Sequence, residues 1–255
     1  MYLRAPTAVC EWSAVEAFLA AHSLGLLTTA IPLAGQSTIQ ASHLPFLFHA
    51  PNTPPPPDET PSTSGDGTWH VGPDSSVDLG RLQCHLARAN PQAKALLSLT
   101  RPEEVLVVFA SPLNQAGYIT PQWYTTTKPL TAKTVPTWNY AELHIYGLIS
   151  PTTPETLRQI VSDLSDVHEH KHVEKKGEGD VWKVEDAPEA YIRVLERSIV
   201  GMEIKIMKVG LKMKMSREKG EGDRQGVLEG LRGLGGDAGE MADLVERLGP
   251  IKKAS

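Results

Sequence analysis

Apolar and polar residues alternate along much of this chain with the two-residue period of a β-strand. Alternating or continuously apolar runs predict strands over 26–31, 37–48, the first part of 82–97, 104–110 and 143–149. The longest run covers 201–215. It places Met202, Ile204 and Ile206 on one face and, beyond Gly210, Leu211, Met213 and Met215 on one face. This run predicts either a hairpin or one long bent strand.

Other segments carry apolar residues at helical spacing. Over 11–21, one stripe is formed by Trp12, Val15, Phe18 and Leu19. Helices are likewise predicted over the end of 82–97, from 154 to about 166, and over 188–199, 223–234 and 237–248. The polar segments 125–134 and 167–180 are predicted to be loops.

The connections between most of these strands are too short for parallel crossovers. The sequence therefore predicts an α+β fold, an antiparallel β-barrel with appended helices. Pro45 interrupts the run 37–48, which indicates an edge, a bulge or a strand end, because an interior strand tolerates proline poorly. The barrel domain is predicted over 1–234, followed by a C-terminal helix and tail over 235–255.

Residues 50–68 form a low-complexity insertion with consecutive prolines followed by Asp, Glu, Ser, Thr and Gly. Such a composition cannot bury a core, so the insertion is predicted to be a flexible loop with polyproline II character. Because strands are predicted on both sides, we interpret it as an insertion in a hairpin. We expect it to be dispensable, with limited proteolysis cutting there first.

Composition narrows the classes of function. The chain has 255 residues, 40% of them hydrophobic and 22% charged, which is typical of a globular protein. A net charge of −5 gives no global field that would attract nucleic acid or an anionic membrane. The 2 cysteines make neither a disulfide framework nor a zinc-type spacing, and no apolar run is long enough to span a membrane. We expect an intracellular protein, cytoplasmic or nuclear.

No metal site is predicted. His168, His170 and His172 alternate, but no carboxylate or thiol lies at a convincing ligand spacing from them. We interpret the three histidines as part of a solvated loop.

The join between strand and helix in 82–97 is Asn90-Pro91, an N-cap followed by a residue suited to the first helical turn. A helix start carries unpaired N–H groups and a partial positive charge, which attract anions. His85, Arg88 and Lys94 lie around it. This corner either holds a cofactor phosphate or is an ordinary capped helix with solvated charges, since it has no glycine-rich loop.

Several short motifs together resemble the PaiB family, the FMN-binding negative transcriptional regulators. They are Ala-Ser-His-Leu-Pro-Phe at 41–46, His-Leu-Ala-Arg-Ala-Asn-Pro-Gln at 85–92, Tyr-Ile-Thr-Pro-Gln-Trp-Tyr at 118–124, Val-Pro-Thr-Trp-Asn-Tyr at 135–140 with His144, and the segments 199–204 and 223–227. The resemblance implies a split-barrel flavin-binding fold, usually a homodimer with FMN at the subunit interface. Family members commonly read Lys-Leu-Ser-Gln-Asn-Arg where this chain has Lys-Met-Ser-Arg-Glu-Lys at 214–219.

The resemblance also implies cofactor-binding positions. The FMN phosphate and ribityl chain are expected at Ser42, His43 and Leu44 and at His85, Arg88 and Asn90. The flavin ring is expected near Trp123, Trp138 and Asn139, by analogy of fold.

Two functions compete. The first is a flavin-binding repressor with DNA as its partner. The basic run from Lys205 to Lys219 would then contact phosphates, although a solvated strand face is its ordinary interpretation, and the sequence shows no helix-turn-helix or zinc finger.

The second is an FMN-dependent oxidoreductase acting on a small molecule, with His43, His144 and Tyr140 as candidate proton donors. No catalytic residue is assigned, and a haem-binding alternative has no assignable axial ligand. The chain shows no hydrolase or phosphotransferase motif.

Overall fold

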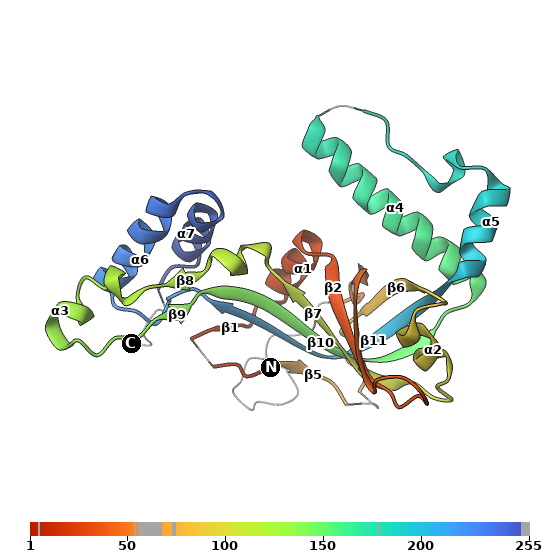
Figure 1. The fold of residues 1–255 in the computed structure, drawn as a ribbon, viewed down its shortest axis with the longest axis horizontal. Coiled ribbons are helices and arrows are strands. Elements are labelled where there is room, and N and C mark those ends of the chain that lie inside the picture. Colours follow the sequence, from red (N-terminus) through yellow and green to blue (C-terminus); the bar gives the residue numbers. More distant parts are fainter. Residues whose placement is uncertain (5, 54, 56–67, 73–74, 178, 251–255) are drawn as a thin grey trace.

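The computed structural model describes residues 1–4, 6–53, 55, 68–72, 75–177 and 179–250 (Figure 1). The strands are β1 (Ala8–Val9), β2 (Leu24–Ala30), β3 (Ile39–Pro45), β4 (Leu47–His49), β5 (Trp69–His70), β6 (Arg81–Ala87), β7 (Glu103–Ala110), β8 (Tyr118–Ile119), β9 (Thr137–Trp138), β10 (Tyr140–Pro151) and β11 (Ile199–Lys214). The helices are α1 (Trp12–Ala21), α2 (Pro91–Leu97), α3 (Thr127–Thr131), α4 (Pro154–Lys176), α5 (Glu189–Ser198), α6 (Glu221–Leu234) and α7 (Gly236–Leu248). Short 3-10 turns are η1 (Pro112–Ala116), η2 (Pro121–Trp123) and η3 (Val184–Asp186).

The main sheet curls into a split barrel. Its order is β3-β2-β7-β10-β11-β6-β4, with β1 and β5 also paired to β11, and its strand pairs are antiparallel. β3 and β4 stand at opposite edges of this order, yet only Phe46 separates them in the chain. The two edges therefore come within about 7 Å of each other, the reach of two extended residues. The predicted α+β antiparallel barrel is confirmed, and Pro45 ends a strand at an edge as expected.

β11 is one long strand, which decides between the two interpretations of 201–215. A bulge interrupts its pairing with β10: Tyr146 pairs with Lys208 and Gly147 with Ile206, so Met207 is the extra residue. The buried positions shift accordingly, from Ile204 and Ile206 before the bulge to Val209 and Leu211 after it. The break in the alternation therefore lies at Met207, before Gly210.

The barrel interior and the helices share one hydrophobic cluster. From α1, Val15, Phe18 and Leu19 are buried in it, as the predicted stripe requires. From α7, Met241, Ala242 and Val245 join the same cluster, so the C-terminal helix packs onto the barrel core. Figure 1 shows α2, α4 and α5 at one end of the sheet and α3, α6 and α7 at the other.

Two segments predicted to be loops contain helix. α4 continues through most of 167–180 and ends at Lys176, capped by Gly177 in the left-handed conformation at φ 78°. Glu and Lys favour helix even without an apolar stripe, which explains the extension. Segment 125–134 contains the short helix α3, which Asp223 anchors from α6.

β4 pairs with β6 and β5 pairs with β11, so the proline-rich insertion between β4 and β5 does not lie in a hairpin. Most of the insertion, 56–67, lies outside the described residues. Among the residues that are described, no helix combines the length and apolar composition that a membrane crossing requires.

Candidate functional site

The predicted corner at Asn90 forms as a capped helix start. The Asn90 side chain accepts a hydrogen bond from the Gln92 N–H at 2.9 Å and donates to the Ser42 hydroxyl at 3.1 Å. The buried Gln92 amide donates to the carbonyls of Leu27 and Gln40, which fastens α2 to β2 and β3. The structure thus brings together Ser42 and Asn90, two of the predicted phosphate ligands.

The start of α2 has few donors left for an anion. Pro91 has no N–H, the Gln92 N–H is bonded to Asn90, and the Lys94 N–H donates to the Asn90 carbonyl at 3.1 Å. With only 7 residues, α2 also carries a short dipole. An anion at this corner would therefore be held by side chains, because the helix start uses its own donors.

His43 and Leu44 point in opposite directions from β3. Leu44 is buried in the core. His43 is exposed on the outer face of the sheet, the face turned away from that core, where it pairs in register with Leu26. There it lines a shallow groove of about 450 Å³ together with His22 and Val108. Of these two predicted residues, only His43 presents a side chain to a ligand.

Arg88 lines a different cavity. This cavity of about 360 Å³ lies beyond the end of β10 and the start of β11, between α5 and the start of α4. Its walls include Arg193, Arg197 and Thr152. Among the described residues, Arg88 and Arg197 have no ion-pair partner, and the buried Thr152 hydroxyl has no hydrogen-bond partner. The cavity therefore gathers unpaired donors that suit an anion, beside one carboxylate, Glu196, whose Oε1 atom lies 3.8 Å from Arg158.

His85 lies on β6 in register with Gly201, which lines this arginine-lined cavity. Burial lowers the pKa of His85 below its ordinary 6.5, so the ring is neutral at neutral pH. Its Nδ1 atom is buried without a hydrogen-bond partner. His85 therefore keeps one unused polar atom close to the predicted phosphate region.

The predicted ring residues lie at the other end of the sheet. Asn139 is fully buried, and its Oδ1 atom accepts a hydrogen bond from Ser216 at 3.0 Å. Trp138 is 43% exposed and packs edge-on against Tyr118, with ring centroids 5.4 Å apart. Within one chain, Trp138 offers a surface for a flat ring. Asn139 is inaccessible: its Oδ1 atom is used in the fold, and its Nδ2 atom has no hydrogen-bond partner among the described residues.

The segment 223–227, one of the family-like motifs, clamps this end together. Buried Asp223 accepts the N–H groups of Thr126 and Thr127 at 2.8 and 2.9 Å, and the Thr127 hydroxyl as well. Burial tends to raise the pKa of Asp223, but these hydrogen bonds outweigh it and hold the pKa below the ordinary value. Arg224 donates to the Val245 carbonyl at 2.6 Å, which ties α6 to the end of α7.

Trp123 packs against α6, the helix that carries Asp223 and Arg224. A Cβ atom at Gly226 would lie 1.9 Å from the Trp123 carbonyl oxygen, and one at Gly230 would lie 2.2 Å from the indole ring. The two glycines thus let Trp123 pack directly on α6. Trp123 belongs to the support of the ring region and is only partly accessible.

Asn139 and the arginine-lined cavity of Arg88 are far apart in one chain. Asn139 immediately precedes β10, whereas Thr152, which lines the cavity of Arg88, immediately follows it. An extended strand of 12 residues spans about 40 Å, at roughly 3.3 Å per residue. Figure 1 shows the same separation, with α2 at one end and β9 at the other. Ser42 and His43 lie between these ends, in register with the middle of β10 through β2 and β7. A single flavin bound to one protomer cannot touch both Asn139 and the cavity of Arg88.

Sequence reasoning missed Arg193 and Arg197. They lie one helical turn apart on α5, which the sequence predicted correctly as a helix. Their four-residue spacing indicates that both side chains lie on the same face of the helix. Nothing in the sequence indicated that α5 packs across the end of β11, where that face meets Arg88.

The chain is similar to proteins from bacteria and fungi. The family model described as "Putative FMN-binding domain" matches residues 1–208. An uncharacterised protein of Emericella nidulans is 37% identical over 269 residues, covering 99% of each chain. The "Protease synthase and sporulation protein PAI 2" of Bacillus subtilis is 29% identical over 163 residues, covering 64% of this chain and 70% of the relative. The solved FAD and haem binding protein from Mycobacterium smegmatis has a TM-score of 0.44 at 12% identity, covering 81% of this chain and 72% of that chain.

The matched region holds the curled sheet from β1 through most of β11 and includes every predicted site residue. The Bacillus relative is PaiB, which confirms the resemblance read from the motifs. The chain therefore belongs to the FMN-binding domain family.

Proposed function

We propose that this protein binds FMN as a homodimer, with each flavin lying across the subunit interface. One protomer supplies the phosphate-binding side chains of the arginine-lined cavity, Arg88, Arg197 and Thr152, and the other supplies the surface around Trp138. The observation that carries the proposal is the separation of these two groups along β10. Because a flavin is much shorter than this strand, it reaches both groups only if a second chain contributes one of them.

The outer face of the sheet supports such a dimer. Leu24, Leu26, Leu106, Val108 and Leu148 project from β2, β7 and β10 on this face, and none of them is fully buried in one chain. Apolar side chains left open on a sheet face favour association. A two-fold axis through the middle of β10 would also exchange its ends, placing the Arg88 end of one protomer beside the partner subunit's Trp138.

The residues present fit a phosphate. Arg88 and Arg197 have no ion-pair partner among the described residues, and the Thr152 hydroxyl is buried without a hydrogen-bond partner. A guanidinium group can hold a phosphate through two parallel hydrogen bonds. Flavin, when bound, supplies the redox chemistry, and the protein binds it, orients it and excludes water.

For the role of the bound flavin, the described residues favour oxidation or reduction of a small molecule. On the outer face of β10, His144 lies 3.7 Å from Glu142 and lowers the pKa of that carboxyl. The His144 Nδ1 atom is buried without a hydrogen-bond partner. His144 and exposed His43 are therefore available to hold or move a proton at this face.

Repression of transcription, the role implied by the family resemblance, has weaker support from the residues. Lys208 and Lys212 of the basic run stack over Tyr146 and Tyr140, at 5.9 and 5.0 Å from the ring centroids. In the helical pair α6 and α7, acidic residues outnumber arginines, so the pair does not present a basic recognition helix.

A mixed-dimer titration tests the shared site. The variants Arg88→Ala and Trp138→Ala are each expected to bind FMN weakly as homodimers. Heterodimers of the two, purified through different affinity tags, are expected to regain tight binding at one of their two sites, because one site combines both unaltered halves. A heterodimer without any tight site would place both groups on the same chain's flavin and contradict the proposal. A parent protein that is monomeric with FMN tightly bound would contradict it as well.

A second experiment separates the two roles. The flavin-loaded dimer is mixed with NADH or NADPH under anaerobic conditions, and flavin bleaching is followed at visible wavelengths. Rapid bleaching that slows in His144→Gln, with FMN affinity unchanged, supports the oxidoreductase role. Absence of bleaching, together with binding to duplex DNA that weakens steeply with salt, supports repression instead.

A further inference from the structure

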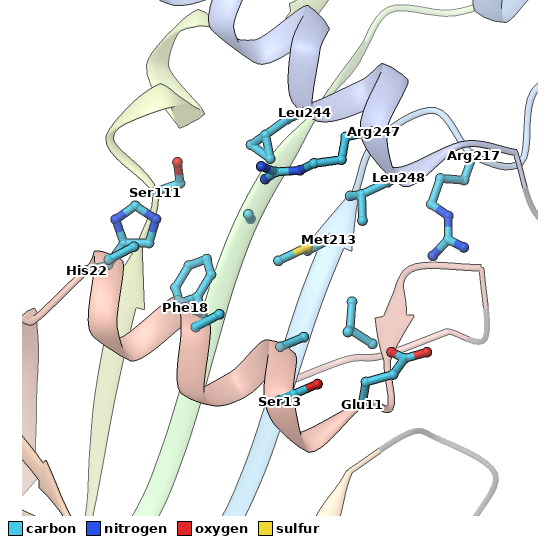
Figure 2. Close-up of a pocket in the computed structure, with 15 residues that line it drawn as sticks. Glu11, Ser13, Phe18, His22, Ser111, Met213, Arg217, Leu244, Arg247 and Leu248 are labelled. Carbon is cyan, nitrogen blue, oxygen red and sulfur yellow. The ribbon is translucent and has the colours of Figure 1, made fainter.

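A further cavity lies beside α1 and shares Ala21 and His22 with the groove of His43, but it does not contain any of the predicted flavin residues. It occupies about 660 Å³ between α1 and α7, over the start of β10 and the end of β11 (Figure 2). This volume is in the range of small-molecule sites in proteins. Residues after 208, including Arg217, Leu244 and Arg247, form one of its walls and lie outside the matched family region.

The floor of the cavity is apolar. Phe18 from α1 and Met213 from β11 face it, and Leu244 and Leu248 from α7 close it from above (Figure 2). The small side chains of Ala14 and Ala17 leave space along α1. A ligand lying on this floor would exchange water for hydrocarbon contacts.

Two cations are held over this floor without a counter-ion. Arg217 and Arg247 form no ion pair among the described residues, and the Arg217 Nε atom is buried without a hydrogen-bond partner. Figure 2 shows the Arg247 side chain extending over the cavity from α7, while Arg217 points down from the far rim toward Glu11. Unpaired guanidinium groups beside apolar surface are typical of sites for amphiphilic anions.

The charges around the cavity indicate a ligand with a single negative charge. Arg217 and Arg247 contribute two positive charges and Glu11 one negative charge. His22, at the opposite end, packs edge-on against Phe18, and its burial lowers its pKa below 6.5, so it is uncharged at neutral pH. A net charge of about +1 is balanced by a monoanion, whereas Glu11 would repel a dianion.

We propose that this cavity binds a monocarboxylic acid with an apolar body, its carboxylate held by Arg247 and its hydrocarbon part lying on Phe18 and Met213. The site goes beyond the proposed flavin function. Its main ligand-binding side chains, Arg247, Phe18 and Met213, are not among the predicted flavin residues.

Calorimetric titration of the full-length protein with 2-naphthoate and decanoate tests the proposal, with the neutral alcohol 2-naphthalenemethanol as the matched ligand. Saturable binding of the acids is expected, with 2-naphthoate bound about 10-fold or more tightly than the alcohol, the worth of one charge-assisted hydrogen bond. Arg247→Gln, at an exposed helical position, is expected to remove most of this preference. Arg101→Gln removes the same charge outside the cavity and should leave the preference intact.

A variant with a larger side chain in the cavity tests where the apolar part of the ligand lies. Ala17 is exposed on α1 and lines the cavity. Ala17→Trp should therefore weaken the binding of the acids and of the alcohol alike, without unfolding the helix. Melting curves confirm that each variant folds, and FMN titrations of the same proteins should be unchanged. The proposal would be overturned if neither acid binds, or if 2-naphthoate and its alcohol bind with equal affinity. Unaltered binding in Arg247→Gln and Ala17→Trp would overturn it as well.

Discussion

The two ends of β10 use their polar residues in opposite ways. At the Asn139 end, Asp223 and Arg224 are nearly inaccessible. Asp223 accepts hydrogen bonds from the start of α3, and Arg224 donates through Nη2 to the end of α7, while its Nε atom has no hydrogen-bond partner among the described residues. At the Thr152 end, Arg88 and Arg197 stand at the edge of a cavity without ion-pair partners among the described residues. Each end carries a family-like motif: the segment 223–227 maintains the fold at one end, whereas Arg88 of the segment 85–92 is free to bind at the other.

The contrast shows how to interpret a charged motif. A buried charge is tolerated only when neighbouring groups satisfy it, so it reports on the local fold. An unpaired guanidinium at the edge of a cavity stays hydrated at little cost in free energy, and its N–H groups remain available to a ligand. Substitutions of Asp223 and of Arg88 should therefore affect different measurements, stability for the first and binding for the second.

The largest effect is expected at the buried end. Asp223→Ala leaves the N–H groups of Thr126 and Thr127 and a hydroxyl without their acceptor, so unfolding by urea should require about 3–5 kcal/mol less. Asp237→Ala, in the first turn of α7 but exposed, is the matched control and should change the free energy of unfolding by less than about 0.5 kcal/mol. Equal effects of the two substitutions would remove the distinction between the ends.

At the open end, Arg88→Ala should weaken FMN binding by about 10- to 150-fold, the equivalent of roughly 1.5–3 kcal/mol for one charge-assisted contact. Riboflavin, which lacks the phosphate, should bind the variant and the parent equally. Arg88→Lys should recover part of the loss, because an ammonium group lacks the planar fork. If the apo protein melts earlier and both flavins lose affinity together, Arg88 is structural and the two ends are alike.

Acid should weaken the buried end selectively. The folded-state pKa of Asp223 is lowered below 3.8, so its contribution to stability is complete above that value and is lost as the pH falls through the folded pKa. Asp223→Asn has no such titration. The difference in free energy of unfolding between parent and Asp223→Asn should therefore shrink as the pH drops below about 4. A constant difference down to pH 2 would contradict this.

The smallest effect is expected at Glu189 on α5. Its carboxylate accepts hydrogen bonds from Arg158 at 2.8 Å and Arg193 at 2.9 Å, and these cations lower its pKa to about 2. The network is exposed and screened by salt, so Glu189→Gln should barely move the melting temperature. The substitution also frees Arg193, which lines the cavity of Arg88, so FMN affinity should rise slightly at low salt and match the parent at high salt.

Periodicity predicted the strands and most helices because burial on one face leaves a direct mark on the sequence. It failed at 167–176, where α4 extends with charged residues and has no apolar stripe to reveal it. The candidate site was harder to predict. Arg88 and Asn90 are two residues apart, yet one lines a cavity built by α4 and α5 and the other bonds to β3. Such partners are set by packing between distant segments, which no local pattern encodes.

The position of β11 in the chain has a consequence for synthesis. β11 pairs with β10, β6, β1 and β5, but all four precede it in the sequence. A nascent chain that ends before residue 199 therefore exposes strand edges whose partner has not yet been made, and such edges invite association with other chains. The barrel can close only late in translation, when 199–214 has left the ribosome.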